Sequence, residues 1–155
     1  MKAKSTDKKI FQLTDNEQLL GELNYESIFS HKAKIKLINS DIYDIKTVGI
    51  FGTSITVTKN GTEFANLKMN WRGQIVFVFQ DSQEFVFKAK GSYRNKFIIE
   101  NKDGENLIQF DPKFNWSKFN YNYDISFEKR PKDVLFVLLG IYASNYYIAA
   151  ISGQI

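Results

Sequence analysis

The segment Val134–Ile151 near the C-terminus is apolar along its whole length and contains no charged side chain. As a helix, its 18 residues would span roughly 27 Å at ~1.5 Å per residue, close to the ~30 Å hydrocarbon core of a bilayer. A helix that is apolar on every side must be buried, either in a protein core or in a membrane. The segment is therefore either the core of a barrel or a membrane anchor.

The composition of the segment favours the protein core. Ser144 and Asn145 lie in the middle of the segment beside Tyr146 and Tyr147, and tyrosines prefer the interface of a membrane to its centre. Small residues such as Gly140 would let surrounding strands approach the helix closely. A C-terminal tail anchor remains the alternative, with basic residues before the segment on the cytoplasmic side.

The residues that flank the segment predict where the helix begins and ends. Pro131 suits a position just outside the helix or in its first turn, where no backbone donor is lost. Asp133 can cap the N-terminus and suits the positive end of the helix dipole. Gly153 is a suitable residue just after the C-terminus. We predict a helix over about residues 133–152.

The chain before the helix alternates between short apolar runs and turn residues, which is typical of an all-β domain. In one run Ala33, Ile35 and Leu37 alternate with lysines, which predicts a half-buried strand. Asn60-Gly61 is a strong hairpin signal. About 11–12 strands are expected: Ile10–Thr14, Leu19–Tyr25, His31–Ile38, Ile42–Val48, Ile55–Thr58, Glu63–Met69, Gln74–Gln80, Glu84–Lys90, Lys96–Glu100, Asn106–Phe110, and two within Lys113–Phe127.

These elements predict a mainly β protein, an antiparallel β-barrel of about 11–12 strands that wraps a central hydrophobic C-terminal helix. Barrels of ~8 strands hold only side chains, whereas cans of ~11 strands can hold a helix. Turns at residues 15–16, 60–61 and 103–104 recur at intervals of 45 and 43 residues, either as an internal repeat or as a coincidence of hairpins. The lumen is expected to contain one parity of Val76, Phe77, Val78 and Phe79, together with Ile98 and Phe127.

The formal net charge of +4 is concentrated near the N-terminus, because residues 1–9 carry +3 and the remainder +1. We expect a flexible basic tail over residues 1–9 and one barrel domain over residues 10–155. No broad basic face is left for nucleic acid, which is not an expected partner. The absence of cysteine excludes disulfides and thiolate chemistry,. No secretory signal follows Met1, and a cytoplasmic or membrane-peripheral location is expected.

The strand series from Ile10 to Phe127, followed by Asp133 and the apolar segment, resembles the tubby C-terminal-like group. That group includes the tubby domains, the phospholipid scramblases and the LURP-one-related proteins. The resemblance is one of architecture and implies a barrel around a C-terminal helix, with contact to lipid head groups. The palmitoylated cysteines, the calcium segment and the phosphoinositide pocket of these relatives have no matching residues here, so no functional residue is transferred.

No catalytic, cofactor-binding or metal-binding residue is predicted. The single histidine, His31, has no nucleophile or orienting partner that the sequence can place. The acids of Asp41–Asp44 and Asp103–Glu105 suit turns better than a calcium loop. The aromatic residues Trp71, Trp116, Tyr121 and Tyr123 are expected to pack in the core and at the corners of the barrel, because base stacking would need a basic groove.

Two basic groups are the surface candidates for contact with anionic lipid. Three lysines alternate along one predicted strand, and three basic residues precede the helix. These candidates are Lys32, Lys34, Lys36, Lys129, Arg130 and Lys132. The expected function is a non-enzymatic binding or scaffolding module whose partner is an anionic phospholipid or a protein. A tail-anchored membrane protein and a ligand-binding or hydrolytic enzyme at the barrel mouth are the alternatives.

Overall fold

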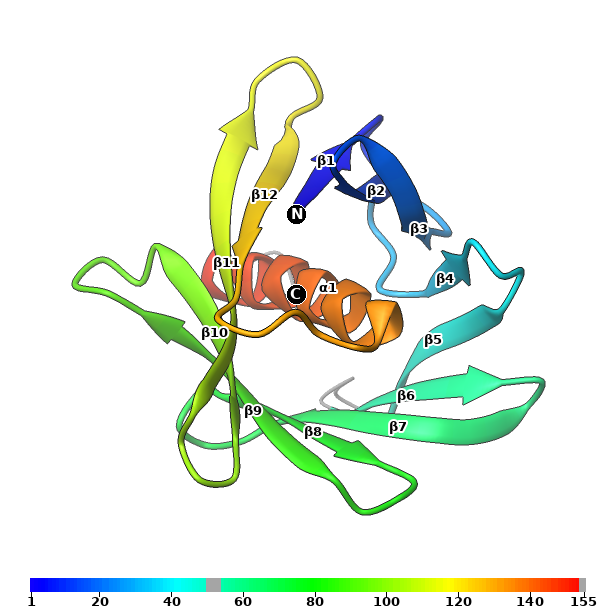
Figure 1. Ribbon diagram of the computed structural model, residues 1–155, viewed down its shortest axis with the longest axis vertical. Helices are drawn as coiled ribbons and strands as arrows, with labels where there is room; N and C mark the ends of the chain where they lie inside the picture. Colours follow the sequence, from blue (N-terminus) through cyan, green and yellow to red (C-terminus); the bar gives the residue numbers. More distant parts are fainter. Residues whose placement is uncertain (50–53, 154–155) are drawn as a thin grey trace.

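Alternation of inward apolar and outward polar side chains curls the chain into a closed antiparallel barrel around one helix (Figure 1). The computed structural model describes residues 1–49 and 54–153. Each strand pairs with its neighbours in the sequence, and β1 pairs with both β2 and β12 to close the ring. The described strands are β1 (Lys2–Ser5), β2 (Ile10–Asp15), β3 (Gln18–Tyr25), β4 (Ala33–Leu37), β5 (Ile42–Val48), β6 (Ser54–Lys59), β7 (Thr62–Met69), β8 (Ile75–Phe79), β9 (Glu84–Lys90), β10 (Lys96–Asn101), β11 (Asn106–Asn115) and β12 (Asn120–Ser126).

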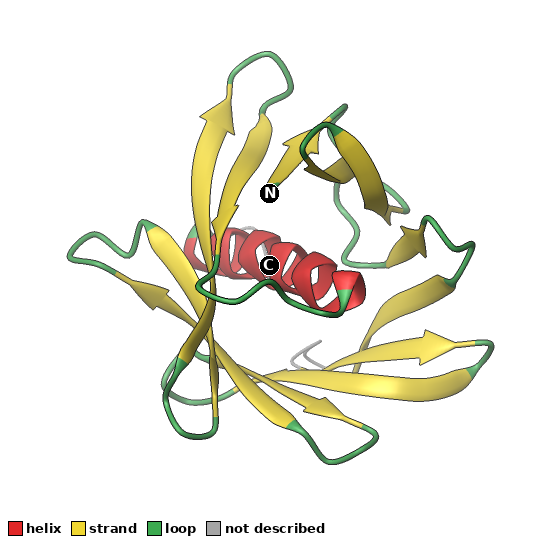
Figure 2. Cartoon of the chain, in the orientation of Figure 1, coloured by secondary structure: helices red, strands yellow, loops and turns green. Residues whose placement is uncertain are grey.

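The predicted barrel around a C-terminal helix is confirmed, and the helix α1 (Val134–Ile151) crosses its interior (Figure 2). Asp133 is the N-cap, and its carboxylate accepts a hydrogen bond from the Leu135 N–H at 2.9 Å. Gly153 follows the C-cap residue Ser152 with φ of 72°, a left-handed conformation that glycine adopts without strain. Both predicted helix ends are therefore confirmed.

The prediction of a flexible tail over residues 1–9 is wrong. Ala3 and Ser5 are buried while Lys2 and Lys4 are exposed, which is the alternation of a strand. Ala3 lies opposite Leu13 of β2 and Tyr123 of β12. The four residues of β1 therefore close the barrel, because without them β2 and β12 would have unpaired edges.

The strand β11 joins two runs that were predicted as separate strands. It continues from Asn106 through Pro112 to Asn115, although proline cannot donate a ladder hydrogen bond. Its pairing with β10 ends at Phe110, whereas its pairing with β12 continues to Asn115. Pro112 therefore lies where β11 has one free edge, which is where a strand tolerates proline.

The helix lies close to β3 and β11 because glycines remove side chains at both contacts. A Cβ atom on Gly21 of β3 would lie 3.0 Å from Leu138 Cδ1 and 2.9 Å from the Lys36 carbonyl oxygen. A Cβ atom on Gly140 of α1 would lie 2.2 Å from Phe110 Cζ of β11. Close packing of the helix backbone against the barrel wall therefore depends on both glycines.

Phenylalanine rings connect the helix with the strands β8 and β9. Phe136 of α1 lies 4.7 Å from Phe85, 6.0 Å from Phe79 and 6.3 Å from Phe77 between ring centroids. Phe77 is buried and Phe79 packs against the core, whereas Val76 is half-buried and Val78 exposed. In this run the side chains of Phe77 and Phe79 therefore face the lumen, and those of Val76 and Val78 face outward. Phe127, as predicted, packs against the core.

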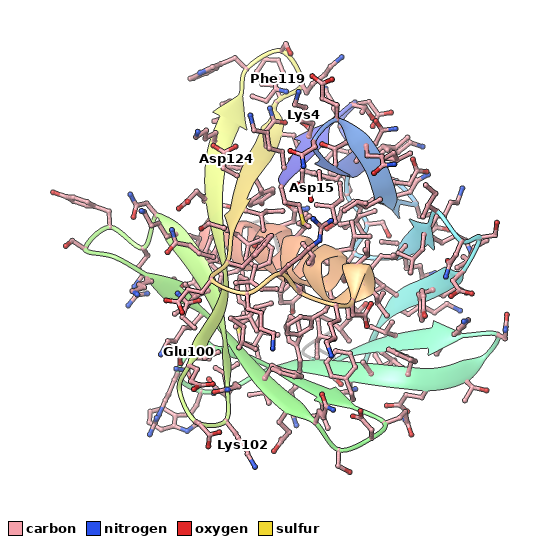
Figure 3. The ribbon with its side chains drawn as sticks, in the orientation of Figure 1. Lys4, Asp15, Glu100, Lys102, Phe119 and Asp124 are labelled. Carbon is pink, nitrogen blue, oxygen red and sulfur yellow. The ribbon has the colours of Figure 1, made fainter. Side chains whose placement is uncertain are left out.

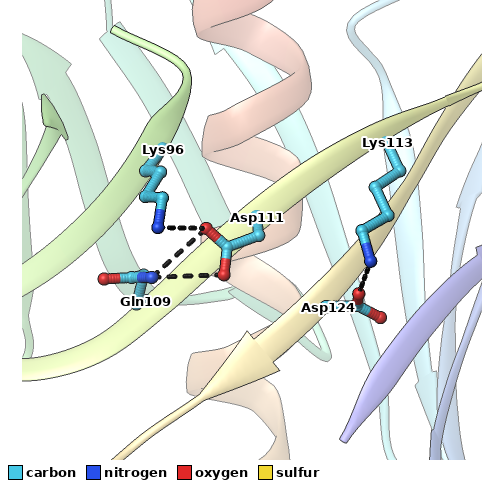
Figure 4. A network of polar contacts seen from close by, with 5 residues as sticks. All are labelled: Lys96, Gln109, Asp111, Lys113 and Asp124. Carbon is cyan, nitrogen blue, oxygen red and sulfur yellow. Dashed lines mark hydrogen bonds and ion pairs between the residues drawn. The ribbon is translucent and has the colours of Figure 1, made fainter. Parts of the chain in front are cut away.

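The prediction that Ile98 faces the lumen is wrong, because its strand neighbours Phe97 and Ile99 occupy the core. Ile98 is nevertheless only 1% exposed. On the outer face it lies opposite Lys88 and Gln109, whose aliphatic stems can cover it. Polar contacts near it tie the outer faces of β10, β11 and β12 together (Figure 4). The residues drawn there are Lys96, Gln109, Asp111, Lys113 and Asp124.

Three hairpins share an irregularity that supports an internal repeat. The register shifts at Leu13/Thr14 before the β2–β3 turn, at Val57/Thr58 before the β6–β7 turn and at Ile99/Glu100 before the β10–β11 turn. The three irregular strand pairs, β2–β3, β6–β7 and β10–β11, follow one another at intervals of four strands. The three similar turns in the sequence belong to the same three pairs. A bulge increases local twist and bends its strand, so the repetition helps to curl the sheet evenly.

Polar side chains of the helix bond to the barrel wall. The Tyr123 hydroxyl donates to Asn145 Oδ1 at 2.6 Å, and Asn145 Nδ2 donates to the Tyr25 hydroxyl at 3.1 Å. The Tyr142 hydroxyl donates to the His31 carbonyl oxygen at 2.8 Å. By length and composition α1 could cross a membrane, but 67% of that span is buried inside the barrel. The polar residues in the apolar segment thus fix the helix within the barrel.

Alkaline pH is expected to unfold the protein through its buried tyrosines. Burial raises the pKa of Tyr25, Tyr123 and Tyr142 above the usual value, which is about 10 in an unfolded chain. Above about pH 10 the unfolded state therefore binds fewer protons than the folded state, and the free energy of unfolding falls with rising pH, by up to ~1.4 kcal/mol per pH unit for each tyrosine. Circular dichroism should be lost together with the rise of tyrosinate absorbance from these residues. Their ionisation near pH 10 in a protein that is still folded would contradict this.

Candidate functional site

The loops of an up-and-down barrel alternate between its two ends, and here the two ends differ in chemistry. One end holds the C-terminus of α1 and the described loops 6–9, 26–32, 70–74, 91–95 and 116–119; we call it the aromatic end. The other holds the N-terminus of α1, the turns 16–17, 38–41, 60–61, 80–83 and 102–105, and the segment 127–133; we call it the acidic end. Figure 3 shows Phe119 at the upper tip of one hairpin and Lys102 at the lower tip of another.

All the exposed aromatic side chains among the described residues lie at the aromatic end. Phe29, Trp71 and Tyr93 are 88–91% exposed, each in a different loop. Trp116 and Phe119 project from the β11–β12 hairpin, and Phe114 precedes them in β11. An exposed apolar side chain alone needs no explanation, but a concentration of them marks an interaction surface.

Charge is divided along the same axis. The described loops of the aromatic end carry six basic side chains and two acidic ones, Asp7 and Glu26, a net charge of +4. The turns and segment of the acidic end carry seven acidic side chains and four basic ones, a net charge of −3. The basic residues of the aromatic end are Lys8, Lys9, Lys32, Arg72, Arg94 and Lys118. The net charge of the protein is thus strongly polarised along the barrel axis.

Part of the aromatic end forms one continuous patch around a cavity of about 580 Å³. The cavity is bounded by loop 26–32, the β11–β12 hairpin and the last turns of α1. The Phe114 and Trp116 rings lie 4.8 Å apart in an edge-to-face contact. Lys8 Nζ lies 5.8 Å from the Phe119 ring centre, within cation–π distance. We call Ile28, Phe29, Phe114, Trp116 and Phe119 the aromatic patch.

Cations accompany the aromatic side chains elsewhere at this end as well. The Arg72 guanidinium lies 4.9 Å from the Trp71 ring centre, and Arg94 follows Tyr93 directly. The expectation that Trp71 and Trp116 pack in the core or at corners is wrong, whereas buried Tyr123 fits it. The sequence signal that was missed is an aromatic residue beside a basic one within a turn.

His31, the single histidine, lines the cavity of the aromatic end. Its ring lies 5.2 Å from the Tyr146 ring in an edge contact. Partial burial lowers the pKa of His31 below its usual value, so the imidazole is neutral at neutral pH. Among residues 1–49 and 54–153 no group of three side chains could hold a metal ion.

The structure separates the predicted basic candidates. Lys32 lies at the aromatic end beside His31. Lys34 and Lys36 project from the outer face of β4 as predicted, and Lys34 forms an ion pair with Asp44. The other three candidates, Lys129, Arg130 and Lys132, lie at the opposite end of the barrel, where Arg130 pairs with Asp15.

The environment of these last three residues is acidic. They border a cavity of about 980 Å³ together with four carboxylates, at the end whose net charge is negative. An anionic surface approaching there would meet more acidic than basic side chains. The positive charge of the described loops is therefore concentrated at the aromatic end.

Each end of the barrel thus holds one of the two cavities described above. Comparison with known proteins does not add a relative: no family model, curated protein or solved structure matches the chain.

Proposed function

We propose that the protein is a non-catalytic binding module that docks on anionic membrane surfaces through its aromatic end. The observation that carries the proposal is the coincidence of all described exposed aromatic side chains with a net charge of +4 at one end of the barrel. The proposal includes membership of the tubby-like group, and its support is that a barrel around a C-terminal helix is the architecture which that resemblance implies.

The chemistry of the aromatic patch suits the interface of a bilayer. Aromatic side chains, tryptophan and tyrosine above all, favour the boundary between head groups and acyl chains, and apolar side chains gain free energy by leaving water. Basic side chains near an anionic surface contribute ~1 kcal/mol each. Because Lys8, Lys32 and Lys118 lie around the patch, the hydrophobic and the electrostatic contributions to binding act at the same place.

The polarity of the barrel would also set its orientation. The acidic end is repelled by the surface that attracts the aromatic end, so the barrel axis is expected to point away from the membrane. In this arrangement Lys32 contacts lipid, whereas Lys129 and Lys132 face solution. The helix stays in the barrel and supports the loops from within.

Flotation with vesicles containing phosphatidylserine tests the proposal on the full chain. We expect the wild type to float at low salt and Phe29→Ser/Trp116→Ser/Phe119→Ser to lose at least about tenfold in partition, since each apolar side chain contributes ~1.5–3 kcal/mol when fully buried. Leu19→Ser/Ile38→Ser/Ile42→Ser is the matched control, because it removes exposed apolar side chains from the acidic end; it should float like the wild type.

A charge-reversal pair separates the two basic groups. Lys8→Glu/Lys118→Glu and Lys129→Glu/Lys132→Glu change the net charge equally, and only the first should abolish flotation. Equal loss in both would point to nonspecific attraction and contradict docking through the aromatic end. Failure of the wild type to float would favour a protein partner for the aromatic patch and overturn the proposal.

A further inference from the structure

A second cavity, of about 980 Å³, opens at the acidic end, opposite the aromatic patch. Its walls are the β8–β9 turn, the β10–β11 turn and the segment 127–133, which leads into the helix. Figure 1 shows this segment crossing the barrel mouth from β12 to the start of α1. Its volume is at the upper end of the range for small-molecule sites, roughly 300–1,000 Å³.

The inner part of this cavity is lined by aromatic and aliphatic side chains. Phe64, Phe79, Phe85, Leu107 and Phe136 line it, and each packs against the core while keeping part of its surface accessible. The rings hold one another in place: Phe79 contacts Phe64 at 6.0 Å and Phe85 at 5.8 Å in edge contacts. The apolar wall is therefore pre-formed, which lowers the entropic cost of binding.

The rim of the cavity carries a negative excess. Two of its charged groups are already engaged: Arg130 pairs with Asp15 of β2, and Asp133 caps the helix. Three carboxylates and two lysines carry the other charges of the rim, namely Asp81, Glu105, Glu128, Lys129 and Lys132. Asp81 accepts a hydrogen bond from the Gln83 N–H and Glu105 accepts one from Asn101 Nδ2, bonds that leave the negative charge of each carboxylate in place. Because the whole end has a net charge of −3, a cation is favoured there over an anion.

We propose that this cavity binds a small soluble amphiphile with an apolar body and a cationic amine or ammonium head. The apolar body displaces water from the phenylalanine wall, and the head stays at the rim near the carboxylates. Aromatic rings attract a quaternary ammonium group through their faces, and the carboxylates at the rim attract its positive charge. The site is independent of membrane docking, because it lies at the opposite end of the barrel.

Three probes that share a ten-carbon chain and differ in head charge test the proposal: decyltrimethylammonium, decanol and decanoate, each below its micelle concentration. Binding is followed by amide chemical shifts of the full-length protein. We expect saturable shifts in residues 79–85 and 105–108, with the cation binding at least about fivefold more tightly than the carboxylate, the effect of one unit charge at about 4 Å in water. Preference for decanoate, or no saturable binding of any probe, would overturn the proposal.

Two pairs of variants locate the binding. Gln83→Trp places a large ring at the cavity wall and should abolish binding of all three probes, whereas Gln18→Trp, at an exposed position of the same end, should not. Glu128→Lys should reduce the preference for the cation, whereas Glu17→Lys changes the net charge of the same end equally and should leave it. Unchanged binding in Gln83→Trp would place the probes outside this cavity and contradict the proposal. No vesicle is used, so the result is separate from that of flotation.

Discussion

Replacing Gly140 with alanine is expected to lower the free energy of unfolding by about 2 kcal/mol, although alanine is the better helix former by about 1 kcal/mol. The new Cβ atom would lie 2.2 Å from Phe110 Cζ, so either the helix or β11 must move. For a chain of this length ~2 kcal/mol corresponds to a fall in melting temperature of about 4–8 °C. Chemical denaturation of wild type and variant measures the difference.

Shortening the opposing side chain gives the matched control. Phe110→Leu removes the ring atoms that a Cβ at residue 140 would meet, at the cost of some packing. In that background the alanine should be tolerated, so Gly140→Ala/Phe110→Leu should be more stable than additivity of the single variants predicts. A Gly140→Ala protein as stable as the wild type would show that the helix does not pack against β11 as described.

Replacing Asn145 with leucine is expected to destabilise the protein by about 2 kcal/mol, although it makes the helix more apolar. The Tyr123 hydroxyl is buried and donates to Asn145 at 2.6 Å. Leucine has a similar volume but no amide, so this hydroxyl would stay in the core without a partner, at a cost of about 1–3 kcal/mol. Thermal or chemical denaturation checks the effect.

The partner of the lost hydrogen bond again supplies the control. Tyr123→Phe removes the orphaned hydroxyl, so Asn145→Leu/Tyr123→Phe should recover part of the stability lost in Asn145→Leu. A membrane anchor would respond in the opposite direction, because removal of a polar residue favours insertion into a bilayer. Greater stability of Asn145→Leu would therefore contradict a core position for this helix.

The helix and its surroundings were predictable because each depends on local residue chemistry. Absence of charge from Val134 to Ile151 identified a buried helix, and Asp133 and Gly153 marked its ends. The alternation of apolar residues with Lys34 and Lys36 set the faces of β4. These signals are local. Because a helix that is apolar on every side must be buried, the strands around it are predicted to form a closed barrel.

The errors concern features that depend on distant parts of the chain. With four residues, β1 is too short for its sequence to be distinguished from a polar tail, and only its pairing with β12 makes it a strand. Ile98 is predicted to face the lumen because it is apolar, but its register with β9 and β11 turns it outward, opposite Lys88 and Gln109. Exposure of Trp71 and Trp116 follows from their positions in loops, which sequence hydrophobicity does not reveal.

The candidate surface was least predictable because it is assembled from several loops. Phe29, Trp116 and Phe119 are separated in sequence by up to 90 residues, and the antiparallel ring brings their loops to one end. Likewise Lys32 and Lys129 appear equivalent as basic residues, yet they lie at opposite ends of the barrel. The strand order of a barrel must therefore be known before the residues of a binding surface can be grouped.

Hydrogen exchange of the amides of α1, with and without anionic vesicles, tests most directly whether this helix is barrel core while the loops meet the membrane. We expect residues 138–147 to be among the slowest to exchange in detergent-free buffer, and to be equally protected when vesicles are added, while loops 26–32 and 116–119 gain protection. Rapid exchange of the helix in buffer, followed by protection on addition of vesicles, would show instead that the helix enters the bilayer.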